Sequence, residues 1–271
     1  MKLKDFIDQG KLDLTDLSFV YDGGTGYPIN SEIRPEEFIT FAKADFLKSD
    51  TRGLVNALCN AKRAIDCQTD GFLRVNALAV DGLEKQLRPC GVASLSFGTT
   101  QRDGPLKFRL LRALGIATPE LITRMRRLRN LLEHEYRKPR PADVRNAIGI
   151  AELFVQACRG RMQSCFQSIW IGSGNPRPME SVEKEFRIWY THETTPYFDV
   201  KFLENGWRLK NQNRKSPSLR VRVGEEGFMP LLKLIWHVDF YGDMTDPIRS
   251  FFLELGFRLP ARFRVRDRHD L

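Results

Sequence analysis

The stretch RNLLEHEY, residues 129–136, combines residue types that could carry out acid–base chemistry on a phosphodiester. His134 can take up or release a proton near neutral pH, because an unperturbed imidazole has a pKa of about 6.5. Arg129 carries a permanent charge on a planar fork that matches phosphate oxygens. Asn130 could fix a phosphate or the imidazole, and Tyr136 could donate a hydrogen bond or stack on a base. These four residues are our candidate catalytic residues.

The Arg-to-His spacing of this octet is weak evidence by itself, because Lys and Arg make up 43 of the 271 residues and chance matches are common. The same interval separates Arg187 from His192 and Arg264 from His269. We interpret these two pairs as chance, since they lie in a strand-like segment and in the C-terminal tail. The octet differs from them in its helical surroundings.

The octet lies on a predicted helix with clear start and stop signals. Thr118 suits the N-cap position and Pro119 suits the first helical position. Pro139 disfavours helical geometry at the residue before it, so the helix should end near Tyr136 or Arg137. The residues that make one side of this helix apolar are Leu121, Met125, Leu128 and Leu132.

The hydrophobic periodicity divides the chain into three parts. Residues 1–34 mix the strand-like LSFVY with a glycine-rich turn and predict a strand and loop extension. Residues 35–165 carry apolar side chains at helical spacing, which predicts about five amphipathic helices in an antiparallel bundle. In residues 166–271 the period becomes two and later returns to helical, which predicts a β-rich α+β segment. The expected fold class is therefore α+β, a helical bundle with a flanking C-terminal α+β domain.

The clearest helical segment of the second part begins near Leu54. Leu54, Leu58, Ala61 and Ile65 follow one another at steps of four, three and four, and Phe72 continues the series. This pattern predicts one long helix, or two short ones, with these side chains turned toward the core.

The composition favours a soluble, cytoplasmic protein with an anionic partner. The formal net charge is +9 and the isoelectric point is about 9.4. No segment approaches the ~18 uninterrupted apolar residues that a bilayer span needs, and the N-terminus lacks the apolar core of a signal peptide. The five cysteines form no CxxC pair, and no cluster of acids suggests a two-metal nuclease. We expect no metal site, no cofactor and no disulfide framework.

The octet and its surroundings resemble the HEPN superfamily, small helical bundles found in toxin–antitoxin, abortive-infection and RNA-processing systems. Its catalytically active members carry Arg, four to six residues, then His, often with a polar residue after the Arg. One toxin branch has the form Arg, four residues, His, one residue, Tyr, and RNLLEHEY is similar to that form in full. The resemblance covers about residues 35–165 and does not extend to residues 166–271.

The resemblance implies a metal-independent endoribonuclease that acts as a toxin or as an antiviral, abortive-infection effector. The 2′-hydroxyl of RNA would attack the phosphodiester and leave a 2′,3′-cyclic phosphate and a 5′-hydroxyl. His134 would transfer protons and Arg129 would neutralise phosphate charge. Homodimers with two motifs facing one cleft are implied, as is a cognate antitoxin or regulatory protein. The basic residues that would hold RNA beside the motif are Arg126, Arg127, Lys138 and Arg140.

Arg129 and His134 do not share a face of an ideal helix, because five residues place them about 140° apart around the axis and about 7.5 Å along it. Arg129 and Tyr136 flank the apolar side, whereas Asn130, His134 and Arg127 face away from it. Convergence needs the Arg side chain to swing round, the helix to loosen near His134, or a second subunit to complete the site. The resemblance implies the third route.

Two other functions stay open at this point. The bundle could be a non-catalytic module that binds a nucleotide, a nucleic acid or a partner protein, since a surface Arg and His commonly contribute only solvation. Tyr136 could instead be modified by a nucleotidyltransferase antitoxin. Residues 166–271 could sense a trigger, silence the enzyme or extend an RNA surface through the basic residues of LRVRVG and RFRVRDR. His237 is interpreted as a core histidine with a satisfied ring.

Overall fold

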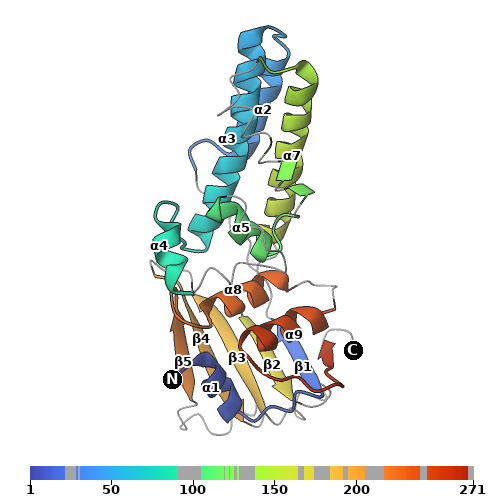
Figure 1. Ribbon diagram of the computed structural model, residues 1–271. Helices are drawn as coiled ribbons and strands as arrows, with labels where there is room; N and C mark the ends of the chain where they lie inside the picture. The colour runs from blue at the N-terminus through green and yellow to red at the C-terminus, as the bar shows by residue number, and fades with distance from the viewer. Residues whose placement is uncertain are drawn as a thin grey trace. The chain divides into compact units, whose positions relative to one another are not determined.

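The protein folds as an α+β chain, shown by the computed structural model in Figure 1. The described part contains eight α-helices and a six-stranded mixed sheet, which confirms the expected α+β class. None of these helices combines the length and the apolar character that a bilayer span requires. The residues that the structure describes are 1–21, 29, 31–90, 105–118, 120, 121, 123, 124, 127, 138–163, 168–173, 184–191, 195–204, 217–238 and 243–267.

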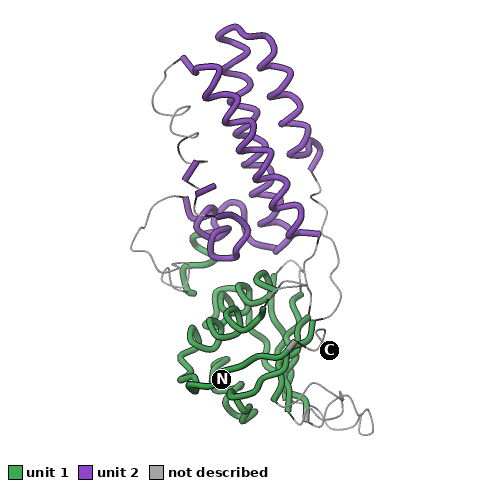
Figure 2. The backbone as a smooth tube through the Cα atoms, turned by 90° about the vertical axis from the view of Figure 1, so that its right-hand side faces the viewer, with its two compact units in different colours: residues 1–25, 84–97, 165–271 green, residues 26–83, 98–164 purple. Residues whose placement is uncertain are grey.

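The chain divides into two compact units, coloured separately in Figure 2. Residues 1–25, 84–97 and 165–271 form the sheet unit, and residues 26–83 and 98–164 form the helical unit. The first residues therefore belong to the sheet unit, where we expected a separate extension over 1–34. The physical reason is that their strand hydrogen-bonds to strands near the C-terminal end of the chain.

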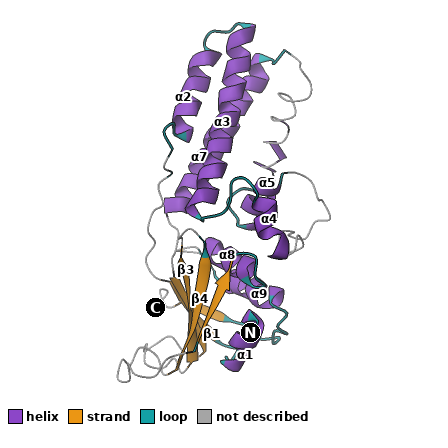
Figure 3. Cartoon of the chain, turned by 90° about the vertical axis from the view of Figure 1, so that its left-hand side faces the viewer, coloured by secondary structure: helices purple, strands orange, loops and turns teal. Residues whose placement is uncertain are grey.

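The helical unit is built around three long helices, α2 (Pro35–Phe46), α3 (Thr51–Val75) and α7 (Pro141–Gln163). Helix α3 packs against α2 and α7, and α2 also packs against α7, so the three form a bundle (Figure 3). The shorter α5 (Leu106–Ala113) contacts α3. The structure gives this part of the chain as a helical bundle.

The core of the helical unit follows the predicted periodicity. Leu54, Leu58, Ala61, Ile65 and Phe72 are all buried, and they lie on one continuous helix, so the single long helix is confirmed over two short ones. Helix α3 starts where the Asp50 carboxylate accepts a hydrogen bond from the backbone N–H of Gly53 at 2.6 Å. The buried side of α7 that faces this core includes Val144, Ala147, Ala151, Phe154 and Cys158.

The sheet unit holds six strands in the order β5-β4-β3-β2-β1-β6. Strands β1 to β5 pair antiparallel, and β6 pairs parallel to β1. The strands are β1 (Leu17–Tyr21), β2 (Ser168–Ser173), β3 (Lys184–Thr191), β4 (Tyr197–Glu204), β5 (Ser218–Arg222) and β6 (Val265–Asp267). The helices of the sheet unit are α1 (Leu3–Gln9), α8 (Phe228–His237) and α9 (Thr245–Glu254). Helix α4 (Leu83–Leu87) starts at the last residue of one segment of the helical unit, and the rest of it belongs to the sheet unit, as does the 3-10 helix η1 (Arg88–Cys90).

One face of the sheet carries the core of this unit. Successive side chains of a strand point to opposite faces, and Phe186, Ile188 and Tyr190 of β3 are buried on the same one. The Phe198 ring packs against the rings of Tyr190 and of Phe228 on α8, with centroids 4.5 and 5.3 Å apart. Figure 3 shows α1, α8 and α9 on this side of the strands. The opposite face is partly buried as well, since Ser168, Trp170 and Glu185 point to it and are buried, whereas Trp189 on the same face is 36% exposed.

Candidate functional site

The helix that is predicted to carry the octet begins where the sequence predicts. The Thr118 hydroxyl accepts a hydrogen bond from the backbone N–H of Leu121 at 3.3 Å, which is the N-cap contact expected of a threonine at this position. Helical geometry follows at residues 120, 121, 123, 124 and 127. The prediction of a capped helix start is therefore confirmed, ahead of the octet.

The candidate catalytic residues lie outside the described residues. They are Arg129, Asn130, His134 and Tyr136, and the candidate RNA-binding Arg126 lies outside with them. The structure therefore gives no distances within this group, and the convergence of the imidazole and the guanidinium stays a prediction. The helix end expected near Tyr136 also falls there.

The three remaining candidate RNA-binding residues, Arg127, Lys138 and Arg140, are all exposed. Arg140 forms two hydrogen bonds to the Asp143 carboxylate, 2.7 Å from its Nε and 3.0 Å from its Nη2. Because the Arg140 side chain is 80% exposed, this ion pair leaves it within reach of a phosphate. Arg127 before the octet, and Lys138 and the paired Arg140 after it, thus place exposed cations on both sides of the octet in the sequence.

Arg140→Ala should raise the pKa of Asp143 toward its ordinary value. The hydrogen bonds from Arg140 lower this pKa in the native chain, and Asp143 in return raises the pKa of Arg140. A lowered carboxylate pKa contributes stability above the unfolded-state pKa of about 4, and the contribution is lost as the pH falls through the native value. Carboxyl NMR titration measures the change. An unchanged Asp143 titration in Arg140→Ala would show that the pair does not persist in solution.

A second cluster of titratable groups lines a cavity of about 230 Å³ between α8 and α9. Lys233 is buried there, and its Nζ lies 3.0 and 3.1 Å from the two carboxylate oxygens of Glu254. The His237 Nδ1 lies 2.7 Å from the Lys233 carbonyl oxygen. The ring of His237 is hydrogen-bonded as expected, although it is only half-buried. Since Lys233 is neutralised by Glu254 and the wall is largely apolar, we assign this cluster to holding α8 against α9.

A third set of side chains, which we call the aromatic–basic face, lies on the side of the sheet opposite α8. The strand register places them on one face of β2 to β5. Within this set, the sequence singled out only the basic residues of LRVRVG, residues 219–224, as a possible RNA surface, because the other members become neighbours through pairing between distant strands. The aromatic–basic face comprises Trp170, Arg187, Trp189, Tyr197, Asp199, Lys201, Arg220 and Arg222.

Arginines lie over aromatic rings on this face. The Arg187 guanidinium carbon is 4.8 Å from the centroid of Trp170 and 4.4 Å from that of Trp189. The Arg220 guanidinium carbon is 4.0 Å from the centroid of Tyr197. All three distances are within the range of cation–π contacts.

No group of three or more His, Cys, Asp or Glu side chains in the described ranges is arranged to hold a metal ion. In comparisons with known proteins, no family model, no curated protein and no solved structure matches this chain. The likeness to the HEPN superfamily therefore rests on the octet and on the helices around it.

Proposed function

We propose that this protein is a metal-independent endoribonuclease of HEPN type. The observation that carries the proposal is the octet RNLLEHEY, which follows a helix start capped by Thr118 within the helical unit. Two further features support it. The α2–α3–α7 bundle is a scaffold of the kind that the HEPN resemblance implies, and the basic residues Lys138 and Arg140 after the octet are exposed.

Each of the four candidate catalytic residues of the octet has a part in the proposed reaction. One histidine takes the proton from the 2′-hydroxyl of RNA, and the 2′-oxygen then forms a bond to phosphorus. The bond from phosphorus to the 5′-oxygen breaks, and a second histidine gives that oxygen its proton. The products are a 2′,3′-cyclic phosphate and a 5′-hydroxyl. Arg129 neutralises the phosphate in the transition state, and Asn130 and Tyr136 position phosphate and base.

The reaction uses an acid and a base, and a homodimer supplies both. Arg129 and His134 are about 140° apart on an ideal helix, so one copy of the motif does not bring them onto one face. Two copies facing one cleft across a twofold axis place the Arg of one subunit and the His of the other beside the same phosphate. The proposed active form is therefore a dimer.

The biological role that fits this chemistry is that of a toxin or anti-phage effector. Cleavage of cellular RNA in the cytoplasm halts growth, which limits phage spread and requires that the enzyme be held silent between infections. A cognate antitoxin or regulatory protein would provide this control. The net charge of +9 suits a protein whose substrate is a polyanion.

Induced expression in a bacterial host tests the proposal. Wild type should arrest growth and produce new RNA ends across the transcriptome, and His134→Ala at equal protein level should do neither. Equal growth and equal RNA profiles for the two proteins would contradict the proposal and would favour a non-catalytic binding module.

A further inference from the structure

We propose that the aromatic–basic face of the sheet unit binds single-stranded nucleic acid. The assignment of RNA as the physiological strand rests on the proposed function. The face itself is defined by strand register and side-chain contacts that do not involve the octet, so it forms a separate site.

The exposed part of this face lies over β3, β4 and β5. Trp189 is 36% exposed, and Lys201, Arg220 and Arg222 are exposed as well. Trp170 on β2 is only 6% exposed, so the exposed part of the face ends at β3. Trp189 therefore offers part of a large planar ring to solvent, next to exposed cations.

The geometry orders the exposed ring for stacking. Arg187 is sandwiched between Trp170 and Trp189, at 4.8 and 4.4 Å from their centroids, so its guanidinium supports the Trp189 ring from one side. Register places Trp189 opposite Asp199 on β4, and Asp199 opposite Arg220 on β5. Trp189 and the Arg220–Tyr197 pair therefore form a row of planar groups across neighbouring strands.

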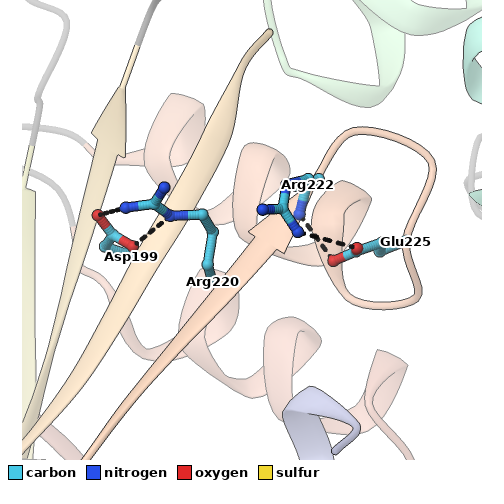
Figure 4. A network of polar contacts seen from close by, with 4 residues as sticks. All are labelled: Asp199, Arg220, Arg222 and Glu225. Atoms are coloured by element: carbon cyan, nitrogen blue, oxygen red, sulfur yellow. Dashed lines mark hydrogen bonds and ion pairs between the residues drawn. The ribbon is translucent and has the colours of Figure 1, made fainter.

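Carboxylates hold the two arginines of β5 in place, as Figure 4 shows. Arg220 donates to the two carboxylate oxygens of Asp199 at 3.0 and 3.3 Å, and its side chain is still 47% exposed. The Glu225 carboxylate accepts a hydrogen bond from the backbone N–H of Arg222 at 2.8 Å, while the Arg222 Nη1 lies 3.9 Å from Glu225 and its side chain is 57% exposed. Because the Arg220 guanidinium is positioned and both guanidinium groups are accessible, a phosphate can approach this pair of arginines.

The charge on this exposed surface favours an anion. Lys201, Arg220 and Arg222 are exposed cations and Glu225 is an exposed carboxylate, whereas Arg187 and Asp199 are half-buried. Glu185 shares the register of this face but is fully buried. The described exposed side chains therefore carry an excess of positive charge.

Single-stranded nucleic acid is the anion that also uses the rings. Its unstacked bases can stack on aromatic side chains, and its phosphates can pair with the cations that lie between these side chains. A duplex hides its base faces within the stack, and an acidic peptide has no planar groups that match Trp189 and Tyr197. The rings and cations side by side on β3, β4 and β5 thus favour a flexible strand with exposed bases.

The test uses the full chain with His134→Ala as background, so that RNA stays intact, and a fluorescent single-stranded oligoribonucleotide in an anisotropy titration. Trp189→Ala should weaken binding about 5-fold or more, from the loss of one base–aromatic stack. The double variant Arg220→Ala/Arg222→Ala should weaken it further and reduce the salt dependence by about 0.7 log unit per lost phosphate contact. Trp189→Phe should retain most of the affinity, because a ring remains.

Arg249→Ala is the matched control. Arg249 is an exposed arginine of α9, on the helix side of the sheet, with its guanidinium carbon 5.5 Å from the centroid of Phe263. Its loss should leave affinity unchanged, and circular dichroism should show every variant folded. Unchanged affinity in Trp189→Ala and in the double variant, or equal affinity for duplex RNA or poly-glutamate, would overturn the inference.

The binding test of the aromatic–basic face and the cleavage test of the octet can give different results. If wild type cleaves RNA and the face variants bind normally, the inference fails and the proposed ribonuclease stands. If wild type does not cleave RNA but binds a single strand through Trp189 and Arg220, the proposed ribonuclease fails and the binding face stands.

Discussion

His134→Ala is expected to lower the rate of RNA cleavage by about 10²–10⁴-fold. An imidazole that transfers a proton in the transition state contributes a factor of this size, and alanine leaves no group that can exchange a proton. The measurement is single-turnover cleavage of an end-labelled RNA by purified protein. Arg129→Ala should lower the rate as well, because the phosphate loses its cationic partner.

His269→Ala is the control for this prediction. His269 follows Arg264 at the same interval as His134 follows Arg129, but it lies in the C-terminal tail. The His269→Ala protein should cleave RNA at the wild-type rate. The Arg129→Lys protein should cleave more slowly than wild type, because the lysine ammonium lacks the planar fork of the guanidinium. A cleavage rate in His134→Ala close to that of wild type would exclude the octet as the active site.

Phe198→Ala is expected to reduce the free energy of unfolding of the sheet unit by about 3–5 kcal/mol. The ring is fully buried and contacts both Tyr190 and Phe228, so its removal leaves a cavity where β4 meets α8. The chain offers a selective probe, because all four tryptophans lie in residues 165–271 of the sheet unit. Urea unfolding followed by tryptophan fluorescence measures the change.

Leu253→Ala is the matched control in the same unit. Leu253 is 52% exposed on α9, and truncation of an exposed leucine leaves no cavity, so the urea midpoint should move little. Equal destabilisation by both substitutions would contradict the assignment of Phe198 to the core. Circular dichroism would report on the helical unit at the same time, since that unit contains no tryptophan.

Local patterns of the sequence predicted local structure. The seam of Leu54, Leu58, Ala61 and Ile65 is buried on α3, because helical spacing alone decides which side of a helix meets the core. Thr118 caps the helix predicted to start at Pro119, through a hydrogen bond to a residue only three positions further along the chain. Both features depend on neighbours in the chain, and a sequence displays these directly.

Pairing between distant segments could not be predicted in the same way. Strand β1 pairs with β2 and β6, which follow it by about 150 and 250 residues, and no local signal names a partner across such distances. The first residues were therefore expected as an extension, although they lie in the sheet. The aromatic–basic face has the same origin, since Trp170 and Arg187 become neighbours only through the register of β2 with β3.

The octet is the case that the structure leaves as a prediction. Its residue types and spacing suggest a reaction, but its four candidate residues lie outside the described part of the chain. An ideal helix separates Arg129 and His134 by about 140°, so we propose that a second subunit completes the site, and the sequence of one chain does not describe such an assembly.

The most direct test of the account is the chemistry of the RNA ends that the purified protein produces in EDTA. Cleavage that leaves a 2′,3′-cyclic phosphate and a 5′-hydroxyl with wild type, and no cleavage with an identically purified His134→Ala protein, is the predicted result. Ends that carry a 3′-hydroxyl and a 5′-phosphate, or cyclic-phosphate ends in equal yield from both proteins, would contradict it.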